Sequence, residues 1–277
     1  MNSQHDPGLA VCLASSFCGY HAHAGFLNEL DRLGWRPGRI AGSSAGALAG
    51  GLWAAGIRGE ALENLFRSWK MKWAFIDALA IPRFLLLPSV WGSSGVLSAK
   101  PLKRFLKKRI GGRRIEDLSG PSVELAVFNL AKAKGEIVRE GPLAEFIAAS
   151  LAVPMLFAAQ EIDGEWFVDG GVTNETPFEQ WLDDPTVHTI LVHTIRHELP
   201  GRRTSWSPGA VTASVHSVTA GEAFRRRREL AKASGKRVHF LETRTPPPGL
   251  FQGKRAGALI EAGKATAAAW VGREQIL

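Results

Sequence analysis

Cysteine is scarce in this chain, which contains only Cys12 and Cys18 among its 277 residues. Two thiols so close in sequence cannot cross-link a secreted disulfide scaffold. A chain of this length also buries enough apolar surface to fold without disulfides or a structural metal. The sequence therefore excludes the small disulfide-rich class of protein and favours a reducing compartment.

Long hydrophobic runs are missing as well. The longest small and apolar stretch, residues 41–57, is shorter than the roughly 20 residues that a membrane-spanning helix needs, and it is rich in Ala and Gly. Its glycine spacing is also found in membrane-helix dimers, but length and composition argue against a span. Residues 1–8 have neither a basic start nor an apolar stretch of signal-peptide length. We therefore expect a cytoplasmic protein.

The charge balance is basic, with 34 Lys and Arg against 26 Asp and Glu, a formal net charge of +8. This surplus favours an anionic partner, either a phospholipid surface or nucleic acid. Hydrophobic residues make up 45% and charged residues 22% of the chain, which excludes disorder as the dominant state. No repeat or low-complexity linker divides residues 1–277, so we predict a single domain.

Strand and helix patterns alternate along the chain, which is typical of a mostly parallel sheet covered by helices on both faces. The fold class is therefore α/β. The predicted strands are residues 8–14, 39–41, 123–130, 136–139, 186–195 and 237–243, and the predicted helices are residues 21–33, 45–55, 60–73, 143–151, 211–234 and 253–271. Residues 74–98 interrupt this alternation with an apolar, proline-containing segment, which we interpret as a lid, an interfacial segment or a core-covering loop.

The pentapeptide Gly-Ser-Ser-Ala-Gly at residues 42–46 has the pattern of a nucleophile elbow. In such an elbow a strand turns sharply into a helix and exposes one serine hydroxyl, here that of Ser44. A side chain at Gly42 or Gly46 would collide with the neighbouring backbone. The predicted strand before the pentapeptide and the predicted small-residue helix after it supply the required context.

A serine hydroxyl needs a base that accepts its proton, and Asp169 is the best candidate. It ends a short apolar strand and is followed by Gly170 and Gly171. This elbow and Asp-Gly-Gly turn together resemble those of the patatin-like phospholipases, which are Ser-Asp dyad lipid acyl hydrolases. The resemblance covers most of the chain, because residues 22–27, 95–97, 141–143, 149–157 and 259–263 are similar to further blocks of that family, in the same order.

The resemblance implies a three-layer α/β/α sandwich and a site in which Ser44 is the nucleophile and Asp169 the base. It implies hydrolysis of carboxylic esters of phospholipids or lysophospholipids through an acyl-enzyme, without a metal or organic cofactor. Asp169 works best as a base when it is partly desolvated. The backbone N–H of Ala45, at the start of a helix, is expected to hold the oxyanion.

The rest of the oxyanion hole departs from the family pattern of three glycines followed by Arg or Lys. This chain has Ser15, Ser16 and Phe17, followed by Cys18 and Gly19. Serine can supply a backbone N–H, and its hydroxyl could replace the missing basic residue. Phe17 would be strained if its position requires a positive φ, and it could crowd the substrate. A catalytically weak lipid-binding or scaffold protein on the same fold is therefore the alternative function.

Histidines offer a competing site. The order Ser44, Asp169 and then His193, His197 or His239 is also that of an α/β-hydrolase triad. His193 and His197 have a spacing that suits a metal on a helix. On a strand, however, residues four apart lie about 13 Å from each other, too far to share an ion. We therefore expect no metal.

Two basic segments could contact an anionic surface. Residues 99–110 place lysines and arginines beside an apolar stripe, a pattern that can lie on an anionic membrane. Residues 225–228 are four consecutive arginines. Without interleaved aromatic residues or a known module, nucleic acid is not expected as a partner. Peripheral contact with an anionic membrane remains an option, and the sequence leaves the oligomeric state open.

Overall fold

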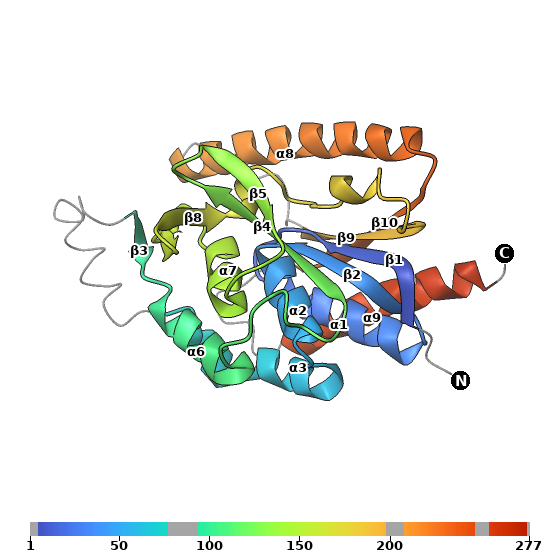
Figure 1. Cartoon of the computed structure of the whole chain (residues 1–277), viewed down its shortest axis with the longest axis horizontal. Coiled ribbons are helices and arrows are strands. Elements are labelled where there is room, and N and C mark those ends of the chain that lie inside the picture. The colour runs from blue at the N-terminus through green and yellow to red at the C-terminus, as the bar shows by residue number, and fades with distance from the viewer. Residues whose placement is uncertain (1–4, 77–93, 198–207, 247–254, 276–277) are drawn as a thin grey trace.

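In the part of the chain that the structure describes, the central sheet has eight strands. The computed structural model describes residues 5–76, 94–197, 208–246 and 255–275. Seven strands follow one another in the order β10-β9-β1-β2-β4-β8-β7, and β5 pairs with β4 off this path (Figure 1). In this order the bounds are Arg237–Thr245, Thr189–His197, His5–Leu13, Arg36–Ser43, Ser122–Asn129, Glu165–Asp169 and Gln160–Ile162, and β5 is Lys134–Val138.

The five strands from β10 to β4 are parallel, and the antiparallel strands gather at the other side of the sheet. β5 and β8 both pair antiparallel with β4, and β7 pairs antiparallel with β8. Val11 of β1 lies beside Ile40 of β2 and Leu191 of β9. Since both neighbours of this strand are parallel and apolar, the predicted mostly parallel α/β core is confirmed.

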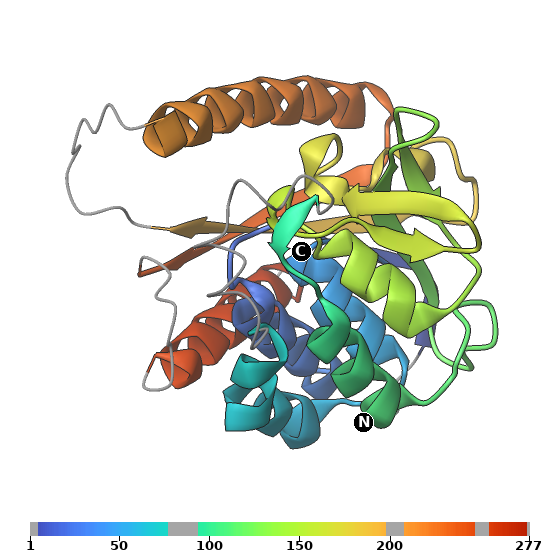
Figure 2. The ribbon, with the colours of Figure 1, turned by 90° about the vertical axis from the view of Figure 1, so that its left-hand side faces the viewer.

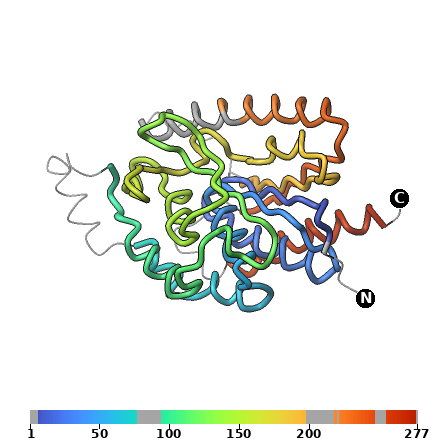
Figure 3. Tube along the Cα trace, viewed as in Figure 1, coloured from blue at the N-terminus to red at the C-terminus, as the bar shows by residue number. Residues whose placement is uncertain are grey.

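Alternation along β1 divides the core between the two faces of the sheet, because successive side chains of a strand point to opposite faces. Leu9, Val11 and Leu13 belong to the larger cluster, and Ala10 and Cys12 belong to a smaller cluster on the other face. Helices α1, α2, α7 and α9 pack with the larger cluster (Tyr20–Arg32, Ala45–Ala54, Leu143–Ser150 and Ala256–Glu274). The first and last helices, α1 and α9, lie side by side (Figure 3).

The long helix α8, Pro208–Ala233, covers the smaller cluster on the opposite face of the sheet (Figures 1 and 2). Phe178 and Trp181 fill the space between α8 and the sheet, and the latter lies in the short 3-10 helix η3, Glu179–Trp181. Two helical layers therefore enclose the sheet, as the three-layer expectation requires.

Several features differ from the sequence-based expectation. The predicted helix at residues 60–73 is two helices, α3 (Gly59–Arg67) and α4 (Trp69–Ala74), because Ser68 caps the second one. Its hydroxyl accepts a hydrogen bond from Met71 N–H and donates one to the Leu65 carbonyl. The short strands β3 (Gly95–Leu97), β6 (Met155–Phe157) and β7 were not predicted.

Most of the segment interpreted as a lid, residues 74–98, lies outside the described residues, which resume at Ser94. Helix α6, Lys100–Ile110, follows it and packs against α4 and α7. Among the helices that the structure describes, none is long and apolar enough to cross a bilayer.

Candidate functional site

Ser44 stands between the end of β2 and the start of α2, in a backbone conformation that few residues adopt. Its φ is 51° and its ψ is −114°, and such strained geometry is typical of functional turns. A Cβ atom on Gly42 would overlap the backbone of Gly46, and one on Gly46 would overlap the carbonyl of Leu13. Glycine is therefore a steric requirement at both positions.

Ser150, at the end of α7, fixes the backbone of the elbow. Its hydroxyl oxygen accepts a 2.9 Å hydrogen bond from the Ser44 N–H and donates a 2.7 Å bond to the carbonyl of Ala126 in β4. The Ser150 side chain is fully buried. Sequence reasoning gave this serine no role, although a polar residue at the end of an apolar predicted helix was a usable signal.

Asp169 ends β8 beside Ser44. Its N–H donates to the Ala152 carbonyl over 3.0 Å, and its Oδ1 accepts a 2.7 Å hydrogen bond from the N–H of Gly171. The Ser44 hydroxyl lies close enough to the same carboxyl group to lower its pKa. Gly170 and Gly171 open the 3-10 turn η2, Gly170–Val172, and a Cβ on Gly170 would overlap the carbonyl of Ala126. The structure thus brings the two predicted dyad residues together.

Burial controls the acidity of Asp169. Desolvation raises its pKa from 3.8 to about 7 and outweighs the hydrogen bonds from Ser44 and Gly171, which lower the pKa, while the charge of Glu175 raises it further. A carboxylate with a pKa near neutrality is a far better proton acceptor than an ordinary aspartate, and it is still ionised in about half of the molecules at pH 7.

The loop before α1 supplies fewer oxyanion donors than we expected. The N–H of Ser15 donates a 2.7 Å hydrogen bond to the Glu175 carbonyl, so it is not available to a substrate. Among the described residues, no acceptor is bound by the N–H of Ser16 or Phe17. The first N–H of α2, that of Ala45, has no intrahelical partner, as at every helix start. Ser16, Phe17 and Ala45 therefore remain the candidate donors.

The positive φ considered for Phe17 is found at the next residue, Cys18. Phe17 does not have a positive φ, whereas Cys18 has a φ of 57°. A backbone turn at Cys18 lets the loop reach α1 without forcing the larger residue into the left-handed region. The Phe17 side chain is 49% exposed and Cys18 is a free thiol.

His197, at the end of β9, forms hydrogen bonds to this loop. Its Nε2–H donates to the Phe17 carbonyl over 3.0 Å and lies 3.2 Å from the hydroxyl oxygen of Ser16. Its Nδ1 lies 2.8 Å from the hydroxyl of Thr245. Burial lowers the pKa of His197, so the ring is neutral at pH 7 and Nδ1 accepts from Thr245. Sequence reasoning considered His197 only as a base or a metal ligand.

The other two histidines considered as a base, His193 and His239, contact other residues. His193 is fully buried between His23, whose Nδ1 lies 2.9 Å from its own Nδ1, and Thr243. His239 lies 3.6 Å from the carboxylate of Glu274. The structure therefore does not bring them to Ser44 and Asp169. Within the described ranges, no three His, Cys, Asp or Glu side chains are grouped to hold a metal.

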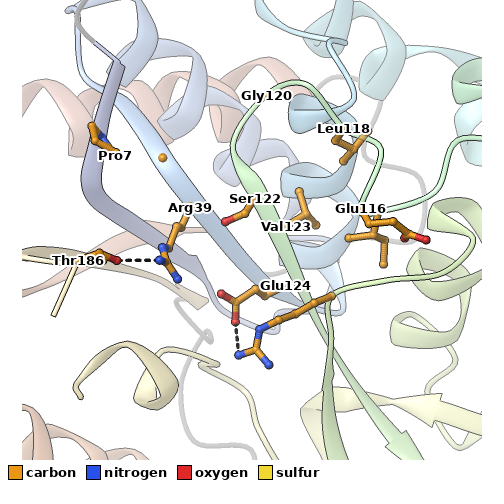
Figure 4. A pocket seen from close by; sticks show the side chains of 12 residues that line it. Pro7, Arg39, Glu116, Leu118, Gly120, Ser122, Val123, Glu124 and Thr186 are labelled. Carbon is orange, nitrogen blue, oxygen red and sulfur yellow. Dashed lines mark hydrogen bonds and ion pairs between the residues drawn. The ribbon is translucent and has the colours of Figure 1, made fainter. Parts of the chain in front are cut away.

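A cavity of about 600 Å³ opens at the other end of the parallel strands (Figure 4). Its charged groups are paired: Arg39 with Asp184 and Thr186, and Arg139 with the buried Glu124. Arg39 lies five residues before Ser44, which is about 16 Å along a strand. This cavity is therefore separate from the dyad.

Comparison with known proteins shows the family of the chain. A family model described as Patatin-like phospholipase matches residues 11–182. Uncharacterised NTE family proteins of Mycobacterium bovis and Mycobacterium tuberculosis are 34% identical over 171 residues, which are 62% of this chain and 44% of each relative. The chain thus covers less than half the length of these relatives.

Among solved structures, VipD from Legionella pneumophila has a similar fold. The TM-score is 0.53 at 14% sequence identity, and the match covers 96% of this chain and 67% of VipD. At this identity the likeness concerns the fold alone. The family match includes the elbow and the Asp-Gly-Gly turn and spans more than half of the chain. The chain therefore belongs to the patatin-like phospholipase family.

Proposed function

We propose that this protein hydrolyses carboxylic esters of lipids, most directly the acyl esters of phospholipids or lysophospholipids, through Ser44 and Asp169. One observation carries the proposal: the strained elbow serine lies beside a buried carboxyl group whose pKa is raised to about 7. Membership of the patatin-like family is consistent with a lipid acyl hydrolase.

In the proposed acylation step, the Asp169 carboxylate accepts the Ser44 proton while Oγ attacks the ester carbonyl carbon. The carbonyl oxygen becomes an oxyanion, which the backbone N–H of Ala45 and those of Ser16 and Phe17 stabilise. The C–O bond to the leaving alcohol then breaks, and the alcohol takes the proton from Asp169. An acyl ester on Ser44 remains.

Deacylation repeats these steps with water. Asp169 accepts a proton from the attacking water, the same N–H groups hold the second oxyanion, and the proton returns to Ser44 as the fatty acid leaves. The scheme needs no metal or organic cofactor, because the base, the nucleophile and the oxyanion donors all come from the chain.

The alternative function is a weakly catalytic lipid-binding or scaffold protein on the same fold. It is favoured by the Ser15 N–H, which is bound to the Glu175 carbonyl rather than open to a substrate. Such a protein would bind lipid yet turn over esters slowly or not at all.

A panel of lipid and short-chain esters assayed with three variants separates the two functions. We expect wild type to hydrolyse a subset of the panel, and we expect Ser44→Ala and Asp169→Asn to lose nearly all of that activity. Ser43→Ala is the matched control, because its hydroxyl is buried without a hydrogen-bond partner among the described residues. Full activity in Ser44→Ala or Asp169→Asn would refute the dyad, and an inactive wild type that binds lipid would support the alternative.

We also propose a cytoplasmic location with peripheral contact to an anionic membrane, where a lipid ester would be reached. The scarcity of cysteine and the basic charge balance support this placement.

A further inference from the structure

Helices α4 and α6 form a surface with an unusual composition. They pack against each other, and Figure 2 shows this part of the chain, in cyan and green, below the sheet. Their inner residues, among them Met71, Leu102 and Leu106, are buried in the main core. Neither helix contains a single Asp or Glu. Their cationic residues are Lys70, Lys72, Lys100, Lys103, Arg104, Lys107, Lys108 and Arg109. Of these, Lys107 pairs with Glu145 of α7.

Two tryptophans stand on the outer side of α4. Trp69 is 60% exposed and Trp73 is 50% exposed, and their rings meet edge to face at 5.5 Å. The ammonium of Lys72 lies over the ring of Trp69. Large exposed aromatic rings are uncommon on a surface that faces only water, and tryptophan beside lysine is typical of protein surfaces that sit at the headgroup level of a bilayer.

Aromatic contacts of Phe75 link the end of α4 to both sides of the candidate site. Phe75, directly after α4, stacks on Tyr20 at 6.1 Å and meets Phe157 edge to face at 6.4 Å. Tyr20 begins α1 immediately after the oxyanion loop. Phe157 ends β6, a few residues after Ala152, whose carbonyl binds the Asp169 N–H.

Exposed apolar side chains continue the surface around the site. Phe17 of the oxyanion loop is half exposed, and Met155 of β6 is 81% exposed. Val153 and Leu156 are also exposed. Apolar groups at the mouth of the site, beside a cationic flank, suit a layer with apolar chains under anionic headgroups. A nucleic acid or an acidic protein would use the cations but would leave these apolar groups in water.

We propose that the α4–α6 surface, defined by Trp69, Trp73 and the cationic residues of both helices, docks the protein on bilayers that contain anionic phospholipid. The tryptophans insert at the headgroup level, the cations contact lipid phosphates, and the apolar rim around Ser44 faces the bilayer. The role of this docking in presenting ester substrate rests on the proposed function, but the docking itself does not require hydrolysis.

Vesicle sedimentation with the full chain carrying Ser44→Ala tests the docking without turnover. The probes are vesicles of phosphatidylcholine alone and of phosphatidylcholine mixed with phosphatidylglycerol. We expect binding only to the mixed vesicles, weakening as salt is raised. A triple variant, Lys100→Glu, Arg104→Glu and Lys108→Glu, should bind at least about a hundredfold more weakly. Trp69→Ala with Trp73→Ala should weaken binding about tenfold.

The matched control is Arg225→Glu with Arg226→Glu on α8, which removes the same kind of charge from the opposite face of the sheet and should leave binding unchanged. Thermal unfolding checks that each variant is folded. Equal binding to both vesicle types, unchanged binding of the folded α4 and α6 variants, or an equal loss in the α8 control would overturn the proposal. So would tighter binding to a short DNA duplex than to mixed vesicles. Vesicle binding without ester hydrolysis by wild type would refute the proposed function and leave the docking surface standing.

Discussion

The hydroxyl of Ser150 holds the backbone N–H of Ser44 at 2.9 Å and is itself anchored by a 2.7 Å bond to the Ala126 carbonyl. One buried side chain therefore ties the end of α7 to both the elbow and β4. Because this bond supports a strained backbone conformation at Ser44, it sets where the Ser44 oxygen stands relative to Asp169.

Ser150→Ala should therefore reduce turnover although Ser150 itself would not touch the substrate. Loss of the hydroxyl leaves the Ser44 N–H buried without a partner, which costs about 1–3 kcal/mol of stability. A loosened elbow should lower kcat about 10- to 100-fold with little change in KM. The measurement is steady-state ester hydrolysis beside thermal unfolding, and the control is Ser43→Ala. An unchanged kcat in folded Ser150→Ala would show that the elbow keeps its conformation without the hydrogen bond to Ser150.

The pH dependence of hydrolysis should report the ionisation of Asp169. Its pKa is about 7, and the base must be unprotonated, so kcat/KM is expected to rise with pH and reach half its maximum near pH 7. A soluble ester assayed between pH 5 and 9, with folding checked at each pH, gives the profile. Activity that is already maximal at pH 5 would contradict a desolvated Asp169 as the base.

The same desolvation destabilises the folded protein above neutral pH. Because the pKa of Asp169 is higher in the folded state than its ordinary value of 3.8, stability is lost as pH rises from about 4 to about 7. Asp169→Asn removes the charge and keeps an oxygen for the Gly171 N–H. It should be more stable than wild type at pH 8, by at most about 4 kcal/mol, with the difference shrinking towards pH 4.

Denaturant unfolding of both proteins across this pH range measures the effect on Asp169→Asn. An inactive variant that is no more stable than wild type at pH 8 would show that the carboxylate is better solvated than its burial indicates.

His197 should position the oxyanion loop. Its Nε2–H holds the Phe17 carbonyl, so His197→Ala is expected to lower kcat about tenfold or more, in line with partial loss of one oxyanion donor. His197→Gln can still donate a hydrogen bond and should restore part of the rate. The rate is measured by single-turnover acylation at pH 8, where the imidazole of His197 is neutral. Equal rates in wild type, His197→Ala and His197→Gln would show that His197 does not position the oxyanion loop.

Much of this architecture could be predicted from sequence because its causes are local. Gly42 and Gly46 satisfy a steric requirement inside one turn, and the alternation of strands and helices sets the mostly parallel sheet. Asp169 could be predicted because it follows a short apolar strand and precedes two glycines.

The supporting contacts could not be predicted in the same way, since they join residues far apart in the chain. Ser150 is 106 positions from Ser44, and His197 is 181 positions from Ser16. Neither pairing has a local pattern, because each depends on how α7 and β9 pack against the sheet. The occupied N–H of Ser15 likewise depends on the path of residues near Glu175.

The most direct test of the central claim is to locate the adduct of a fluorophosphonate probe by peptide mass spectrometry and to follow its rate of formation. The Ser44–Asp169 dyad predicts a single adduct on Ser44, no adduct in Ser44→Ala and a much slower reaction in Asp169→Asn. An adduct on another serine, or equal rates in wild type and Asp169→Asn, would contradict it.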